Sequence, residues 1–126
     1  MKRRLLQILL GFFFMAAGSL HFINPEFYLR IMPPYLPAPM ALVALSGAAE
    51  IALGALVLWE KTRRLSAWGL ILLLIAVFPA NLHLAFHPEI FPNIPPVFLW
   101  VRLPIQLVFI LWAYLFTRKH KEGEFQ

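Results

Sequence analysis

The chain has 126 residues, of which 61% are hydrophobic and 13% are charged, with a mean hydropathy of +0.75 and a formal net charge of +5. Soluble domains usually carry about 25% charged residues, so this composition excludes an ordinary soluble domain. The sequence contains no cysteine, which leaves the chain without a disulfide or a thiol relay of its own.

Long apolar stretches follow one another along the chain. They cover residues 5–23, 40–59, 65–86 and 97–116. Each is close to the roughly 20 residues that cross a hydrocarbon core as a helix. Because backbone polar groups in lipid must be satisfied within the segment, these stretches should be α-helices. The sequence therefore predicts an all-α fold, a transmembrane four-helix bundle that forms one integral membrane domain over residues 1–126.

The basic residues cluster next to alternate helix ends. The connections before the first stretch, between the second and third, and after the fourth hold Lys2, Arg3, Arg4, Lys61, Arg63, Arg64, Arg118, Lys119 and Lys121, whereas the other two hold only Arg30. This bias predicts that both termini are cytoplasmic, because positive charge is retained on the cytoplasmic side. It points to a multi-pass protein of the cell inner (cytoplasmic) membrane, with the lipid bilayer rather than nucleic acid as the partner of the charges.

The two halves of the chain resemble each other. Matching segments are KRRL at 2–5 and TRRL at 62–65, LHFINPEF at 20–27 and LHLAFHPEI at 82–90, and Pro-Pro at 33–34 and 95–96. They predict two helical hairpins with the same orientation, a parallel repeat. The first apolar stretch also has the pattern of a signal peptide, which would be cleaved off. Because the same pattern recurs in the second half of the chain, we favour a transmembrane helix that is retained.

Both connections on the outer side are rich in proline and aromatic residues. Proline fixes φ and cannot donate a backbone hydrogen bond, so these connections are predicted to be rigid loops that end before the returning helices. Pro79 lies within the third apolar stretch, and it predicts a kink that frees the carbonyl near Ile75.

Polar residues inside the apolar stretches all fall between the midplane and the outer surface. Ser46 and Glu50 share one helix face, and Arg102 and Gln106 share another. Asn81 and His83 are about 200° apart around their helix, so they should not face inward equally. The inner half of the bundle is predicted to be apolar. The expected ligand-binding residues are His21, Ser46, Glu50, Asn81, Arg102 and Gln106.

Glu50 lies near the middle of its helix. A carboxylate at that depth costs about 3 kcal/mol or more, and such groups face the bundle interior and pair. Arg102 is the partner that we expect, in an ion pair with Glu50. The pair either fixes the helix register or belongs to a site that binds a ligand or handles protons, and both interpretations stay open.

Four segments of the chain, GSLHFINPEFY, IMPPYLPAP, LSGAAEIALG and FPANLHLA, resemble the DoxX family of small four-helix bacterial membrane proteins. The resemblance covers almost the whole chain, and it implies a four-helix transmembrane bundle with Glu50 and Asn81 at signature positions. Some members of that family are associated with quinone-linked oxidation of sulfur compounds, and others with thiol and oxidative-stress systems. Because this chain lacks cysteine, a sulfur substrate would require a partner protein.

These observations leave three functions open. The first is a redox-associated subunit that binds a quinone-like or other small apolar ligand, with a redox partner protein or a second copy of the chain. Whether the protein is itself an enzyme, for instance as a subunit of a quinone-linked oxidoreductase, is not decided by the sequence. The second is a non-enzymatic assembly or stress-response protein with a structural polar cluster. The third is a haem site ligated by His21 and His83.

Overall fold

The computed structural model describes residues 2–118, which are helical with short connections. The elements are α1 (Lys2–Ile23), α2 (Pro25–Ile31), α3 (Pro39–Leu56), α4 (Glu60–Phe86), the 3-10 turn η1 (Pro88–Ile90) and α5 (Pro96–Tyr114). The helices α1, α3, α4 and α5 are long and apolar enough to cross a membrane. The prediction of an all-α four-helix transmembrane fold is confirmed, and the chain is a multi-pass membrane protein. Lys119 and Lys121, used in the topology prediction, lie outside the described residues.

Helix boundaries differ from the apolar stretches in two ways. The helix α4 begins at Glu60 rather than at residue 65, because a helix can continue through charged residues beyond the hydrocarbon core. The two proline-rich connections, predicted as loops, contain α2 and η1. In both elements proline occupies the first turn, where its missing N–H costs nothing, so proline here starts a helix instead of only ending one.

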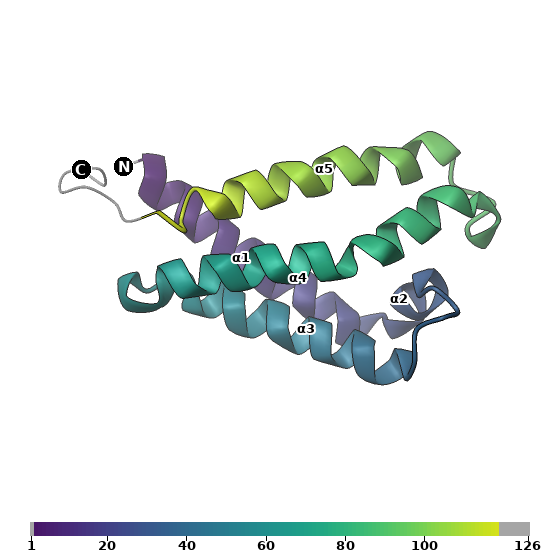
Figure 1. Cartoon of the computed structure of the whole chain (residues 1–126), viewed down its shortest axis with the longest axis horizontal. Helices are drawn as coiled ribbons and strands as arrows, with labels where there is room; N and C mark the ends of the chain where they lie inside the picture. Colours follow the sequence, from purple (N-terminus) through teal and green to yellow (C-terminus); the bar gives the residue numbers. More distant parts are fainter. Residues whose placement is uncertain (1, 119–126) are drawn as a thin grey trace.

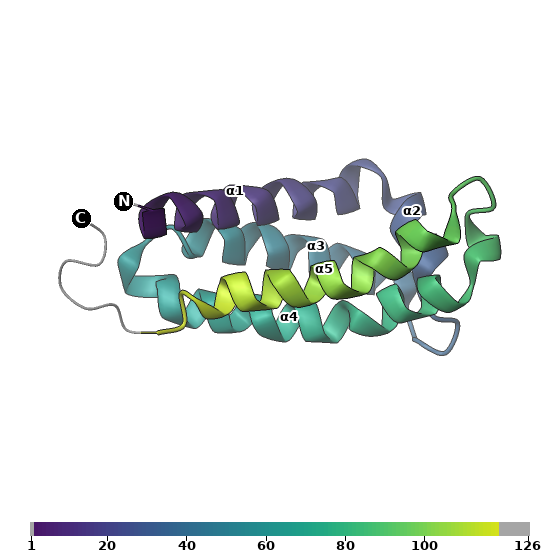
Figure 2. The same cartoon turned by 90° about the horizontal axis from the view of Figure 1, so that it is seen from above.

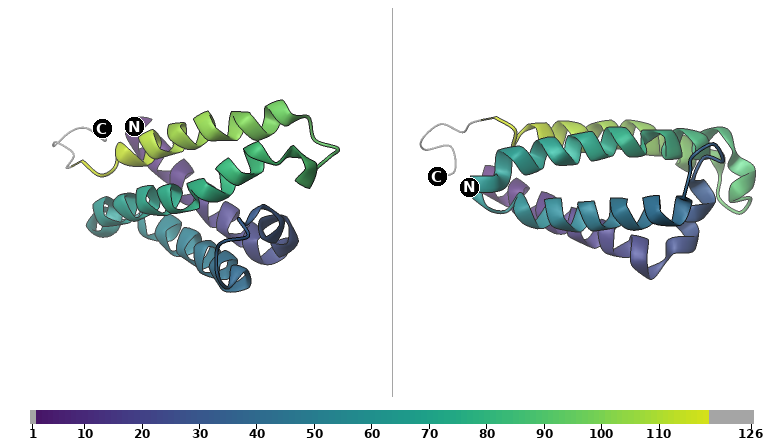
Figure 3. Two further views of the ribbon diagram at one scale, coloured as in Figure 1. Left: turned by 45° about the vertical axis from the view of Figure 1, so that its right-hand side comes forward. Right: turned by 60° about the horizontal axis from the view of Figure 1, so that its bottom comes forward.

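The long helices form two hairpins, α1 with α3 and α4 with α5, and each of these pairs packs together extensively. Figure 1 shows that α1 and α4 run in one direction and that α3 and α5 return in the other, as a parallel repeat requires. Figure 2 places α2 at the same end of the bundle as the connection between α4 and α5. Figure 3 shows the two hairpins lying against each other.

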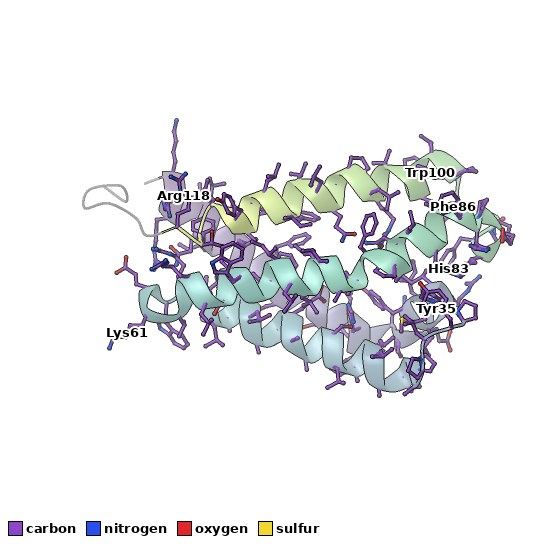
Figure 4. The ribbon with its side chains drawn as sticks, viewed as in Figure 1. Tyr35, Lys61, His83, Phe86, Trp100 and Arg118 are labelled. Atoms are coloured by element: carbon purple, nitrogen blue, oxygen red, sulfur yellow. The ribbon has the colours of Figure 1, made fainter. Side chains whose placement is uncertain are left out.

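The two ends of the bundle differ in chemistry. Lys61 and Arg118 lie at one end, here called the basic end, and Tyr35, His83 and Trp100 lie at the other, here called the proline-rich end (Figure 4). Between them run two apolar clusters. The larger one, around Leu10, Phe14, Leu70 and Phe116, fills the half of the bundle towards the basic end, and the smaller one, around Ile31, Leu84 and Leu99, fills the proline-rich end.

The half towards the basic end is not as purely apolar as the sequence indicates. Gln7 and Arg63 are buried there, with exposed fractions of 0% and 3%. Gln7 donates from Nε2 to the Val57 carbonyl at 2.7 Å, and Arg63 donates from a terminal guanidinium nitrogen to the Arg118 carbonyl at 3.2 Å. These carbonyls follow the last turns of α3 and α5, where helices leave acceptors without intrahelical partners. The buried polar groups therefore cap helix ends.

Candidate functional site

A cavity of about 370 Å³ lies between the hairpins. Its wall includes residues from all five α-helices. The volume falls at the lower end of the range of roughly 300–1,000 Å³ that is typical of small-molecule sites. The structure brings all six predicted polar residues to this one cavity: His21, Ser46, Glu50, Asn81, Arg102 and Gln106. The rest of the wall is mostly apolar, with Phe13, Phe14, Leu74, Val77, Ile105 and Phe109 among its members.

The first hairpin positions its polar groups by close backbone packing. A Cβ added at Gly18 would lie 2.5 Å from the Gly47 carbonyl oxygen, and one added at Gly47 would lie 2.6 Å from the His21 Cβ. Only glycine permits this approach of α1 to α3. His21 follows Gly18 by one turn and Glu50 follows Gly47 by one turn. The contact therefore sets the imidazole and the carboxylate beside each other.

The His21 ring is held at both nitrogens. Nε2 lies 3.0 Å from Glu50 Oε2. Nδ1 lies 3.1 Å from the Val43 carbonyl oxygen and 3.1 Å from Ser46 Oγ. The Ser46 hydroxyl also donates to the Val43 carbonyl at 3.1 Å. This pair of His21 and Glu50, with their side chains exposed by 9% and 12%, is called the dyad below.

The contacts of the dyad determine where its protons lie. A carbonyl oxygen only accepts hydrogen bonds, so Nδ1 carries a proton towards Val43. Nε2 and a carboxylate oxygen can approach each other only if one of them also carries a proton. The dyad is therefore neutral as a whole, either as imidazolium with carboxylate or as imidazole with carboxylic acid. It can hold or release a proton at the cavity wall.

The second hairpin carries a chain of hydrogen bonds. Arg102 donates from a terminal guanidinium nitrogen to Asn81 Oδ1 at 3.2 Å. Asn81 Nδ2 donates to Gln106 Oε1, and Gln106 Nε2 donates to the Leu74 carbonyl. Leu74 lies five residues before Pro79 in α4, a helix that Figure 1 shows to be bent. Gln106 therefore joins α5 to a backbone carbonyl of α4 that lies one residue before Ile75, whose carbonyl Pro79 leaves without its usual N–H donor.

The predicted ion pair between Glu50 and Arg102 is not formed. Within residues 2–118, Glu50 makes its salt bridge with His21, and Arg102 bonds to Asn81. The physical reason is that each group finds a partner inside its own hairpin, where the two helices are packed closest. Both residues still line the cavity, on the two hairpins that face each other.

Tyr28 of α2, from the first of the two connections rich in proline and aromatic residues, completes the polar wall. Its ring stacks on His21 with centroids 3.9 Å apart and an angle of 27° between the planes. Burial raises the pKa of the Tyr28 hydroxyl above its ordinary value, the charge of Glu50 raises it further, and the charge of Arg102 lowers it. The phenol therefore lies within electrostatic reach of both charged residues. The Asn-Pro-Glu segment just before it, typical of a helix start, was the signal that could have placed it on a helix.

Two charged groups at the cavity keep unused hydrogen-bonding capacity. Arg102 Nε and Glu50 Oε2 are buried, and neither has a hydrogen-bond partner in the described chain. The contact of Oε2 with His21 is close, but it lacks hydrogen-bond geometry. Buried polar atoms are rarely left in this way, and each such exception points to a ligand, a water molecule or a functional role.

His83 lies away from this site. It lines a separate, open hollow with Tyr35, Phe78 and His87, and its ring stacks on His87 with centroids 4.2 Å apart. Asn81 faces the cavity while His83 does not, as their angular separation predicts. The alternative of a haem held by His21 and His83 does not fit, because both nitrogens of His21 are engaged and His83 lines a different hollow. In residues 2–118 no group of three or more histidine or acidic side chains is placed to hold a metal ion.

Comparison with known families places the chain. A family model described as a domain of unknown function, DUF8561, matches residues 10–117. The chain belongs to this DUF8561 family. The comparisons find no matching curated protein and no matching solved structure.

The DUF8561 match spans the whole candidate site. Every cavity-lining residue, from Phe13 to Phe109, falls inside residues 10–117. The basic segment before Leu10 lies outside the match. The cavity, with the dyad and the hydrogen bonds that run from Arg102 to Leu74, is therefore part of the DUF8561 domain itself.

Proposed function

We propose that this DUF8561 protein is a DoxX-like, redox-associated membrane subunit that binds a quinone-like or other small apolar ligand between its hairpins. The observation that carries the proposal is the cavity of about 370 Å³, in which seven polar side chains, the six predicted ones and Tyr28, meet an otherwise apolar wall. A few convergent polar groups in an apolar slot are typical of small-molecule sites.

The chemistry of the wall suits a molecule with polar oxygens on an apolar body. Arg102 supplies donors for an oxygen atom, and the dyad of His21 and Glu50 supplies or accepts a proton. Phe13, Phe109 and Val77 supply apolar contact for a ring or an isoprenoid chain. With no cysteine in the chain, electrons would pass to or from the ligand through a redox partner protein.

The charge distribution supports an orientation in the cell inner membrane. Arg3, Lys61 and Arg64 lie at the basic end, which we place in the cytoplasm. The cavity then opens in the outer half of the bilayer. A reporter that is active only in the cytoplasm should work when fused after Gln126, and activity of a periplasmic reporter there would reverse the orientation.

A second candidate function is a non-enzymatic membrane assembly or stress-response protein, and one observation favours it. The amide groups of Asn81 and Gln106 have hydrogen-bond partners within the protein. The series of hydrogen bonds from Arg102 to Leu74 therefore holds α4 and α5 together without any ligand. In that case the cavity would be a by-product of the bend in α4.

Filling the cavity separates the two functions. Ala17 lines it, whereas Ala52 is exposed on α3, so Ala17→Phe occupies the space and Ala52→Phe is the matched control. We expect protein purified in mild detergent to carry an apolar ligand, detected by absorption and mass spectra of the extract. Ala17→Phe should lose that ligand at an unchanged melting temperature, and Ala52→Phe should keep it. An extract without ligand, or one that Ala17→Phe leaves unchanged, would favour the structural function.

A further inference from the structure

The hydrogen-bonding capacity of the cavity is split between its two sides. On the first hairpin, the Glu50 carboxylate has one polar contact in residues 2–118, with His21. A carboxylate offers about four acceptor positions, so most of them are free. On the second hairpin, Arg102 uses one donor for Asn81, and its buried Nε has no partner in the described chain. One wall therefore offers acceptors, and the facing wall offers donors.

The charges are split in the same way. The dyad is neutral as a whole, because the 3.0 Å approach of His21 Nε2 to Glu50 Oε2 requires a proton on one of these two atoms. Arg102 has no carboxylate within salt-bridge distance among the described residues. Among the described residues, its positive charge meets the dipole of Asn81, the Tyr28 phenol and the Phe27 ring, whose centroid lies 5.7 Å from the guanidinium carbon. A ligand oxygen with high electron density would lower the cost of this buried charge.

Tyr28 gives the cavity an aromatic wall beside the dyad. Its phenol lines the cavity, its ring stacks on His21, and both Glu50 and Arg102 act on its hydroxyl. A ligand with an aromatic ring would therefore meet an aromatic side chain here, next to the two charged groups.

We propose that the cavity selects a hydroxylated aromatic ring, with a hydroxyl donating to Glu50 and a second oxygen accepting from Arg102. The inference rests on the proposed function and specifies its ligand. In the imidazolium form of the dyad, Glu50 is a carboxylate and only accepts hydrogen bonds. An oxidised quinone presents two carbonyl acceptors, so its oxygen would face that carboxylate without a proton to share. The hydroquinone or phenol form supplies that proton. The site therefore holds the reduced form of a quinone-like molecule in preference to the oxidised form.

Three naphthalenes of similar size test this selectivity. They are 4-methoxy-1-naphthol, with one hydroxyl and one ether oxygen, and two molecules that only accept, 1,4-dimethoxynaphthalene and 1,4-naphthoquinone. Binding to the intact protein in lipid nanodiscs is followed by calorimetry. A hydrogen bond to a charged group discriminates by about tenfold or more, so the naphthol should have a Kd at least about tenfold lower than the other two.

Variants assign the selectivity to the two walls. Glu50→Gln can both donate and accept, so the preference for the naphthol should fall to near unity, whereas Glu89→Gln, an exposed change outside the cavity, should keep it. Arg102→Met should weaken all three ligands together, since each offers an acceptor. Equal affinities in the parent protein, or tighter binding of the quinone, would overturn the inference and leave the ligand site standing. If none of the three binds, or Ala17→Phe binds them all as the parent does, the proposed function fails as well.

Discussion

The two hairpins follow the same plan but hold their polar groups by different means. In the first, Gly18 and Gly47 bring α1 and α3 into backbone contact, and the dyad forms where they meet. In the second, α4 contains Pro79 and α5 contains Pro104, and side-chain amides join the two helices. The equivalent histidines, His21 and His83, end up in different surroundings. The difference shows that a repeated sequence can produce a site whose two walls differ. The dyad, which holds a proton, lies on one wall, and the positive charge of Arg102 lies on the other.

The largest effect should come from disturbing the glycine contact of the first hairpin. Gly18→Ala places a methyl group against the Gly47 carbonyl oxygen, which cannot move without parting the helices. We expect a loss of about 1–3 kcal/mol in the free energy of unfolding, measured by denaturant titration in mixed micelles. Gly69→Ala is the control, because its methyl group would meet only the Leu53 side chain. Equal losses in both variants would mean that the α1–α3 contact is not specially tight.

The partner of Glu50 can be measured by double-mutant cycles. For His21→Phe with Glu50→Leu we expect a coupling of roughly 1–2 kcal/mol, because the two side chains are in contact. The cycle of Glu50→Leu with Arg102→Leu should be additive within about 0.5 kcal/mol, since each residue bonds inside its own hairpin. A larger coupling in the second cycle would restore the ion pair between the hairpins and remove the distinction drawn above.

A smaller effect is expected where the hairpins meet at the proline-rich end. Arg30 donates to the Ile90 carbonyl, and its guanidinium carbon lies 4.3 Å from the centroid of the Phe91 ring. Arg30→Met removes both contacts at an exposed position, so it should cost about 0.5–1 kcal/mol. Thermal melting in detergent measures this. Phe27 also stacks on Phe91, with ring centroids 5.1 Å apart, and keeps α2 against η1 in the variant. A loss as large as that of Gly18→Ala would show that the two hairpins depend on this end for their association.

The smallest effect concerns Tyr28, which contacts the first hairpin and interacts electrostatically with Glu50 of the first hairpin and Arg102 of the second. Its hydroxyl has a pKa raised above the ordinary value of 10.0, first by burial and then by Glu50. The folded state therefore favours the neutral phenol, and this contribution to stability is present below pH 10 and is lost as the pH rises through the raised pKa. Tyr28→Phe should remove one phenol from the late part of an ultraviolet titration and flatten the fall in melting temperature above pH 10. If the variant instead loses a phenol from the part of the titration near pH 10, with the late part unchanged, Tyr28 would titrate as a phenol in water.

Sequence reasoning predicted the membrane spans and the set of cavity residues, because both depend on depth. Apolar length determines where a helix crosses, and the crossing determines how deep Glu50 or Gln106 lies. It did not predict which polar side chains contact each other, because these contacts depend on how each helix is rotated about its axis and how closely the helix axes approach. The sequence shows that residues 18 and 47 are glycines, yet only the contact of Gly18 with Gly47 in the structure shows that His21 reaches Glu50. Tyr28 was missed because a seven-residue helix in a proline-rich connection leaves no long apolar pattern.

Pairing Glu50 with His21 also has a consequence for biosynthesis. A membrane protein is delivered to the bilayer from its N-terminus onward, so α1 and α3 are made before α4 and α5. If Glu50 paired with Arg102 instead, its carboxylate would stay unpaired in the bilayer until a residue 52 positions later in the chain was synthesised. His21 precedes Glu50, so the acid is paired as soon as the first hairpin forms. Arg102 in turn arrives after Asn81, which already stands in the preceding helix. Glu50 and Arg102 therefore each enter the membrane with a partner already synthesised, which lowers the cost of inserting the helices one at a time.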